Sequence, residues 1–125
     1  MSRAVRIGNA QGFWGDRTDA AREMLALEPD LDFLTLDFLA EVSMSILALQ
    51  RSRDPQAGWP RDFLEILRSL VPYWRRGGRC RVITNAGGLK PLGCARACFE
   101  LLQHAGLSDR TIAVVSGDDF LVFFR

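Results

Sequence analysis

The stretch that constrains the fold most strongly is residues 79–101, where a strand pattern, a glycine turn and a helix pattern follow one another directly. Cys80–Thr84 is short, partly β-branched and largely apolar, which is typical of a buried strand. Asn85–Gly88 ends in two glycines, which accept backbone conformations that other residues avoid. Lys90 and Pro91 then open a helix, because the first helical turn tolerates proline. The stretch predicts a βα unit with a polar loop at the carboxyl end of its strand.

The rest of the chain repeats this alternation of apolar runs and helical periodicities, which predicts right-handed crossovers and one parallel sheet. The nearly continuous apolar run of Leu31–Leu36 favours burial on both faces of that sheet. We therefore predict an α/β fold, a Rossmann-like three-layer sandwich with a parallel sheet. The other predicted elements are strands at Ala4–Ile7 and Thr111–Ser116 and helices at Arg17–Leu27, Phe38–Gln50 and Arg61–Arg76.

Length and composition indicate a single domain that is incomplete. The 125 residues are 48% hydrophobic and 25% charged, which is ordinary for a globular domain. Residues 120–124 are strongly apolar and have no polar partner face, so they need a cover. We interpret them as the cut edge of a larger domain and residues 1–125 as its truncated amino-terminal part.

Charge and hydropathy exclude several classes of protein. Sixteen basic and fifteen acidic side chains give a net charge of +1, so no general field attracts nucleic acid or a membrane. No apolar run approaches the roughly 20 residues that span a bilayer, and no signal peptide is visible. Three cysteines do not form a secreted disulfide framework. We therefore predict a cytoplasmic protein with neither nucleic acid nor membrane as a partner.

Polar side chains follow four of the predicted strands, and the carboxyl ends of parallel strands meet at one edge. Carboxylates there can have raised pKa values and transfer protons, while glycine turns and helix starts offer N–H groups to an anion. We predict that Asp37 and Asp118 are catalytic. The predicted substrate- or anion-binding residues are Asn9, Gln11, Asn85, Gly87, Gly88, Lys90 and Asp119.

Each of these residues also has a purely structural interpretation, because aspartates often cap helices and glycines turn the chain. The glycines within residues 8–15 do not have the spacing of a dinucleotide-binding fingerprint, although Asp37 lies roughly where a ribose-binding acid would be expected. Phe13 and Trp14 either line an apolar pocket for a prenyl chain or pack in the core.

Three further features are interpreted as structural. Cys94 and Cys98 lie on the apolar face of their helix without further ligands, so we interpret them as buried hydrophobic residues and predict no metal site. His104 lies on the polar face and is expected to be solvated. The arginines within residues 75–81 surround the Gly77-Gly78 turn and are interpreted as a solvated corner, with only a weak indication of nucleic acid.

Three motifs, taken together, carry a resemblance that extends over essentially the whole chain. They are Gly8-Asn9-Ala10-Gln11-Gly12-Phe13-Trp14-Gly15-Asp16, Thr84-Asn85-Ala86-Gly87-Gly88-Leu89-x-Pro91 and Ser116-Gly117-Asp118-Asp119. With these motifs the chain resembles the amino-terminal part of the acyclic terpene utilisation (AtuA-like) family. Lys90 stands where the family pattern has Asn, so a cation there either strengthens phosphate binding or displaces a substrate group. Family members are several times longer, which implies that this chain is the first part of such a protein.

The resemblance implies a role in the breakdown of acyclic terpenes such as citronellol and geraniol, whose intermediates travel as acyl-CoA thioesters. A hydratase- or lyase-type step on a branched, prenyl-like acyl-CoA would suit strand-end carboxylates beside an anion cradle. The expected partner is thus a small-molecule substrate, and no cofactor is specified. Two alternatives stay open: a non-catalytic binding half-domain, completed by a second copy or by missing carboxyl-terminal sequence, and an inactive truncated fragment.

Overall fold

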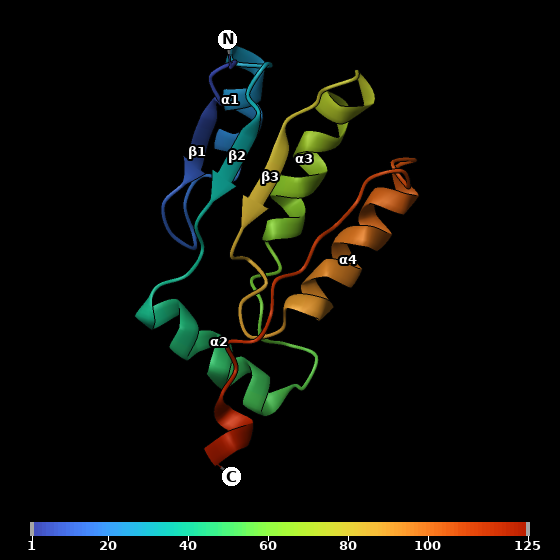
Figure 1. Cartoon of the computed structure of the whole chain (residues 1–125). Coiled ribbons are helices and arrows are strands. Elements are labelled where there is room, and N and C mark those ends of the chain that lie inside the picture. The colour runs from blue at the N-terminus through green and yellow to red at the C-terminus, as the bar shows by residue number, and fades with distance from the viewer. Residues whose placement is uncertain (1, 125) are drawn as a thin grey trace.

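A computed structural model of the chain describes residues 2–124, apart from the side chain of Val122. These residues form a three-stranded sheet, four α-helices and one 3-10 helix (Figure 1). Met1 and Arg125, the two ends of the predicted domain, lie outside the described residues. The elements are β1 (Ile7–Gln11), α1 (Ala20–Leu27), β2 (Phe33–Leu36), α2 (Glu41–Arg53), α3 (Phe63–Arg75), β3 (Arg81–Thr84), α4 (Pro91–His104) and η1 (Leu121–Phe124).

The three strands are parallel and lie in the order β1-β2-β3. Ile7 lies opposite Phe33, Phe33 lies opposite Arg81, and the register shifts between Asn9 and Gln11. Because this order never reverses, right-handed crossovers place α1 and α3 on the same face of the sheet. There α1 packs against β1 and against α3. The predicted α/β fold with a parallel sheet is confirmed.

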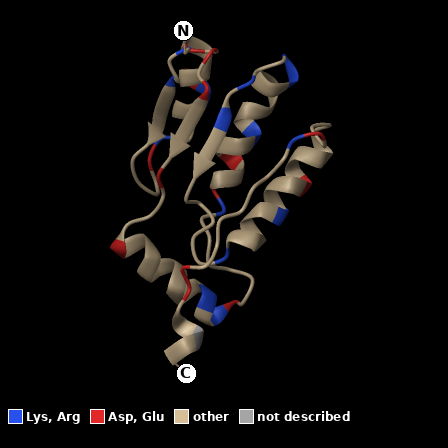
Figure 2. Ribbon diagram, in the orientation of Figure 1, with Lys and Arg blue, Asp and Glu red and all other residues tan. Residues whose placement is uncertain are grey.

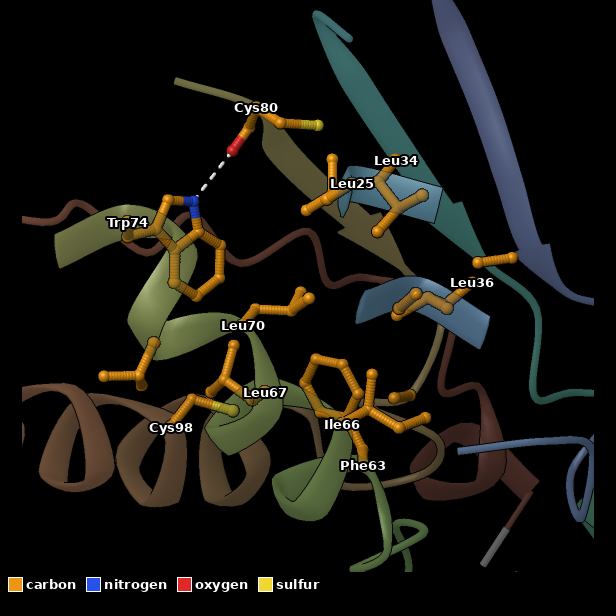
Figure 3. Close-up of a cluster of buried hydrophobic side chains, with 14 of the residues drawn as sticks. Leu25, Leu34, Leu36, Phe63, Ile66, Leu67, Leu70, Trp74, Cys80 and Cys98 are labelled. Atoms are coloured by element: carbon orange, nitrogen blue, oxygen red, sulfur yellow. Dashed lines mark hydrogen bonds between the residues drawn. The ribbon is translucent and has the colours of Figure 1, made fainter. Parts of the chain in front are cut away.

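The hydrophobic core lies between this face of the sheet and the helices (Figure 3). Leu34 and Leu36 from β2 and Leu25 from α1 are almost fully buried. Trp74 donates its indole N–H to the carbonyl of Cys80 over 3.0 Å, which ties the end of α3 to the start of β3. The largest share of the core residues comes from the apolar stripe of α3, which consists of Phe63, Ile66, Leu67, Leu70, Val71 and Trp74.

The opposite face of the sheet is more open than the prediction of a strand buried on both faces implies. Alternate residues of a strand point to opposite faces. On the open face Ile7 is 64% and Ile83 is 55% exposed, and Thr35 is half-buried. The strand order explains this, because covering the second face requires a crossover that runs in the other direction along the sheet.

The prediction of a strand at Thr111–Ser116 is wrong. Residues 111–120, all of which the structure describes, form neither helix nor strand. The segment leaves α4 and runs back to the level of α2 (Figure 1). Ile112 packs against the core, whereas Val115 is 93% exposed. An apolar, β-branched run forms a strand only where neighbouring strands supply packing and hydrogen bonds, and this run has neither.

Within the apolar run of residues 120–124, Leu121–Phe124 forms the short helix η1 rather than an extended edge. The rings of Phe120 and Phe123 lie 6.1 Å apart, and Phe124 is 84% exposed. The side chain of Val122, another member of the predicted run, lies outside the described part of the chain. This segment therefore presents apolar side chains to solvent, as the pattern of the sequence indicated.

The first strand is displaced from its predicted position, since β1 begins at Ile7, where the predicted strand ends. Gly8 lies inside β1 and faces α1, because a Cβ atom on it would lie 2.5 Å from Met24 Sδ. This glycine therefore permits close strand–helix packing and does not open a loop. As a consequence Asn9 and Gln11 belong to the strand itself.

Helix α2 begins at Glu41, three positions later than predicted from Phe38. Phe38 is completely buried, packs edge-on against Phe63, and donates its N–H to Asn85 Oδ1 over 2.8 Å. These contacts hold the chain extended after β2. Their partners are distant in the sequence, so helical periodicity alone does not reveal them.

Candidate functional site

Asp37 and Asn85 join the carboxyl ends of β2 and β3. Asn85 Nδ2 donates to Asp37 Oδ1 over 2.7 Å, and the same carboxylate oxygen accepts the N–H of Leu39 over 3.1 Å. Asn85 Oδ1 in turn accepts the N–H of Phe38. Both side chains are exposed. The pair holds two strand ends together, and Asp37 Oδ2 has no hydrogen-bond partner among the described residues.

Gln11 brings a buried side-chain amide to the same edge. The residue is 2% exposed, and its Nε2 donates to the backbone carbonyl of Phe13 over 3.1 Å. The backbone carbonyl of Gln11 accepts the N–H of Asp37 over 3.1 Å. Within the described residues its Oε1 is buried without a hydrogen-bond donor. Such an acceptor costs about 1–3 kcal/mol unless water or a ligand donates to it. Asn9 is exposed and lies beside Thr35, with 2.9 Å between the amide and the hydroxyl.

The Gly87-Gly88 turn packs against its own chain. Gly88 has φ +55°, and a Cβ atom on it would lie 2.6 Å from the carbonyl oxygen of Gly58. A Cβ atom on Gly87 would lie 2.9 Å from Pro91 Cβ. The N–H of Leu89 donates to the same Gly58 carbonyl over 2.8 Å. Both glycines are therefore required by close packing, whatever else they do.

Two cationic side chains next to this turn already donate hydrogen bonds to backbone carbonyl groups of the protein. Lys90 Nζ donates to the carbonyl of Pro55, in the loop between α2 and α3. Arg51 of α2 donates to the carbonyl of Leu89 over 2.9 Å and lies 3.3 Å from Asp119 Oδ2. The structure therefore brings Asp119 to the glycine turn through Arg51, while the charge of Lys90 is held by a loop carbonyl.

No strand or helix of the described residues positions Asp118. It is exposed in the irregular segment after α4, and no hydrogen bond or ion pair of the described residues joins it to Asp37 or Asn85. The strand predicted at residues 111–116, which would have delivered it to the sheet edge, does not form. Among the described residues Asn85 is hydrogen-bonded to one carboxylate, that of Asp37.

The loop after β1 is closed by Asp16 and anchored by Trp14. Asp16 accepts the N–H groups of Arg17 and Gly12 over 2.8 and 3.1 Å, and these bonds, that of Arg17 first, lower the pKa of its carboxyl group. Trp14 donates its indole N–H to Asp62 over 2.9 Å at the start of α3 and packs against the core. Phe13 is 59% exposed. The interpretation of Trp14 as a packing residue is confirmed.

The three cysteines are free and buried. Burial raises the pKa of Cys80 to about 11, and the hydrogen bond in which Cys94 is the donor to Cys98, together with burial, raises the pKa of Cys94. The raised pKa values of Cys80 and Cys94 keep these two thiols protonated at neutral pH, so they are poor nucleophiles. The interpretation of Cys94 and Cys98 as buried hydrophobic residues is confirmed. His104 is exposed and contacts the carbonyl of Glu100 through Nδ1 over 2.7 Å.

Residues 2–124 lack two further features. No group of three or more His, Cys, Asp or Glu side chains in this range could hold a metal ion. No helix in it combines the length and the apolar character that crossing a membrane requires.

The amino ends of the strands hold a cleft that the sequence analysis missed. Its volume is about 1150 Å³, and Tyr73 and the residues of the Gly77-Gly78 turn form part of its wall. The arginines around that turn are visible in the sequence, but we interpreted them as a solvated corner. The arginines that line the cleft are Arg3, Arg6, Arg76, Arg79 and Arg81.

Comparison with protein families gives a match over nearly the whole chain. The family model described as acyclic terpene utilisation family protein AtuA matches residues 5–124. The match includes every strand and helix of the described structure and all residues predicted to form the site. No curated protein and no solved structure matches the chain.

Proposed function

The chain belongs to the acyclic terpene utilisation family AtuA, and from this premise we propose that its carboxyl edge binds a branched, prenyl-like acyl-CoA. The family supports a role in acyclic terpene utilisation. The proposed chemistry is a hydratase-type step, in which water adds across the double bond of an enoyl thioester. Asp37 is the acid–base group in this proposal, and Gln11 and Asn85 position the reacting groups.

The observation that carries the proposal is a pair of unused acceptors at one edge. Asp37 Oδ2 and Gln11 Oε1 have no donor among the described residues, and the two residues are joined through the backbone bond from Asp37 N–H to the Gln11 carbonyl. Each acceptor can take a hydrogen bond from a water molecule, which has two O–H groups to donate.

The proposed step needs only one carboxylate, that of Asp37. Asp37 takes a proton from the bound water as the water oxygen bonds to the β-carbon of the enoyl thioester. The protonated Asp37 then delivers a proton to the α-carbon, so that the elements of water are added and the carboxylate is restored. The N-terminal N–H groups of α4, which have no side-chain cap, provide a partial positive charge for the thioester oxygen.

The first test replaces Asp37 in the full chain and measures turnover of a branched enoyl-CoA by the loss of its conjugated-thioester absorbance. Asp37→Asn keeps an oxygen for Asn85 and Leu39, so the fold should survive while turnover falls by about 100-fold or more. Asp109→Asn, which removes an exposed carboxylate from the loop after α4, is the matched control and should turn over normally. Equal turnover by Asp37→Asn and the wild-type chain would contradict the role of Asp37.

A second candidate function is binding without chemistry, and it is favoured because Asp118 lies in an irregular segment that no strand carries to the sheet edge. In this case the chain supplies half of a site that a second copy or further sequence completes. Calorimetry with the same branched enoyl-CoA separates the candidates, because binding without consumption supports the half-site and rejects the hydratase. The solution mass, measured with and without this thioester, tests whether a second copy is recruited. No binding at all would contradict both candidates.

A further inference from the structure

The cleft at the amino ends of the strands has features of a second binding site, at the edge of the sheet opposite to Asp37. We propose that it binds a small polyanion that carries two or more phosphate groups. The proposal does not depend on the function proposed for the carboxyl edge. Its volume of about 1150 Å³ is near the range of small-molecule sites, roughly 300–1,000 Å³.

Positive charge gathers at this end of the molecule. Figure 2 shows blue segments at the start of β1, at the start of β3 and in the turn between α3 and β3. Five arginines line the cleft together with only two acidic residues, Asp30 and Asp32. The whole chain carries a net charge of +1, so this excess is a local feature and not the result of a basic composition.

Three of these arginines have no acidic partner. Within the described residues no carboxylate oxygen lies within 4.0 Å of the guanidinium groups of Arg76, Arg79 and Arg81. The nearby carboxylate of Asp32 is occupied on both oxygens, by the side chain of Arg3 and by the N–H of Arg6. The cleft therefore keeps three cations whose charge no side chain of the protein neutralises directly.

The turn that carries Arg76 and Arg79 is held in place by Tyr73. The Tyr73 hydroxyl accepts the N–H groups of Arg79 and Cys80 over 3.1 and 3.0 Å and donates to the carbonyl of Pro29 over 2.8 Å. Gly78 lies directly on the ring, since a Cβ atom on it would be 2.3 Å from Tyr73 Cε1. A fixed turn reduces the ordering that binding would otherwise require.

The chemistry of these side chains favours phosphate groups. Guanidinium groups donate two parallel hydrogen bonds to a phosphate, which a single ammonium group cannot do. Arg81 lies over the ring of Phe33, with 5.9 Å from Cζ to the ring centroid, so that its orientation is restrained. A nucleic acid would require a basic stripe that extends beyond the cleft, whereas Figure 2 shows basic and acidic segments interspersed over the rest of the chain.

The experiment measures the binding of inorganic pyrophosphate to the full chain by calorimetry at low salt. The test variant combines Arg76→Gln, Arg79→Gln and Arg81→Gln, which are exposed positions. The control variant combines Arg53→Gln, Arg68→Gln and Arg96→Gln, which are exposed positions outside the cleft and remove the same charge. We expect saturable binding by the wild-type chain, a loss of about tenfold or more in the test variant, and less than about a twofold change in the control.

Each outcome decides the proposal. Absence of saturable pyrophosphate binding to the wild-type chain would overturn it, and so would equal losses in the two triple variants, because they would indicate only general charge attraction. Tighter binding of a single-stranded RNA oligonucleotide than of pyrophosphate would replace it with a nucleic-acid site. Tyr73→Phe supplies an independent test, because it keeps every arginine but releases the turn, and it should weaken pyrophosphate binding several-fold.

Discussion

The two Gly-Gly turns that flank β3 are built alike but differ in the side chains around them. Gly77-Gly78 precedes the strand at the amino edge, and Gly87-Gly88 follows it at the carboxyl edge. In each turn one glycine has a positive φ and the other packs closely against its own chain. At the carboxyl edge the nearest cations, Lys90 and Arg51, bind carbonyl groups of the protein. At the amino edge Arg76, Arg79 and Arg81 have no acidic partner in the described chain.

A glycine motif is often taken to indicate two properties at once, a backbone turn and a ligand site, and the two turns show that these are separate. A pair of glycines shows where the backbone must turn or pack closely. Whether the place binds a ligand depends on which neighbouring groups still lack a partner. At the carboxyl edge these groups are acceptors, Asp37 Oδ2 and Gln11 Oε1. At the amino edge they are donors. The two edges of one small sheet therefore offer a ligand opposite hydrogen-bonding groups, acceptors at the carboxyl edge and donors at the amino edge.

The largest effect on stability is expected for Gly88→Ala. The new Cβ would meet the Gly58 carbonyl at 2.6 Å and Leu47 Cδ1 at 2.9 Å, and φ is +55°. The left-handed conformation costs about 1 kcal/mol and overpacking about 2 kcal/mol, so unfolding in urea should require about 3 kcal/mol less free energy. A loss below about 1 kcal/mol would show that the loop at Gly58 moves aside at little cost in free energy. The turn at the carboxyl edge would then be less tightly packed than the turn at the amino edge.

A smaller loss, about 2 kcal/mol, is expected for Gly78→Ala at the amino edge. Here φ is not positive, and the obstacle is the ring of Tyr73, 2.3 Å from the new Cβ. Gly12→Ala is the matched control, since the nearest atom to its Cβ would be 3.9 Å away. The same urea titration should show almost no change for the control. A loss in Gly78→Ala larger than that in Gly88→Ala would reverse the ranking of the two turns.

Asn85→Ala should cost about 1–2 kcal/mol. It removes the acceptor of the Phe38 N–H, next to a fully buried side chain, and one donor to Asp37. Asn9→Ala, at an exposed position of β1, is the control and should cost less. If the two variants unfolded at the same urea concentration, the bridge between β2 and β3 would not be the contact that fixes the carboxyl edge.

The smallest effect is expected for Asp32→Asn, and it depends on pH. The N–H of Arg6, followed by the charge and side chain of Arg3, lowers the pKa of Asp32 in the folded chain. A carboxyl group with a lowered pKa contributes stability above its unfolded pKa of about 3.9, and this contribution disappears as pH falls through the folded pKa. Thermal unfolding between pH 7 and pH 2 should therefore show a shallower acid-induced loss for Asp32→Asn. Superimposable curves would contradict this.

The unit formed by β3 and α4 could be predicted almost to the residue, because its signals are local. A β-branched run, two glycines and a proline at the first helical position each restrict the backbone where they stand. The strand expected at Thr111–Ser116 failed for the opposite reason. Its composition resembles that of β3, but a strand also needs a neighbouring strand to pair with. The residues of the run do not show whether such a neighbour is present.

The candidate site also combines features that local sequence signals predict with features that depend on distant residues. Asp37 and Asn85 could be assigned to one edge, because parallel strands place their ends together. The hydrogen bonds between them, and the burial of Gln11, depend on partners far away in the sequence. The cleft could not be predicted, because segments near residues 3, 30 and 79 form it jointly. The sequence shows its arginines but not which of them lack an acidic partner.

The Trp74–Cys80 hydrogen bond also has a consequence for the order of events in folding. It closes a loop between residues that are six positions apart, whereas the Asp37–Asn85 contact joins residues 48 positions apart. The entropy of loop closure grows with the logarithm of loop length, which puts the longer closure at a disadvantage of about 2 kcal/mol. The turn between α3 and β3 should therefore be ordered early, while the ends of β2 and β3 are still separate. The turn that carries Arg76 and Arg79 would be ordered before the sheet edge that carries Asp37.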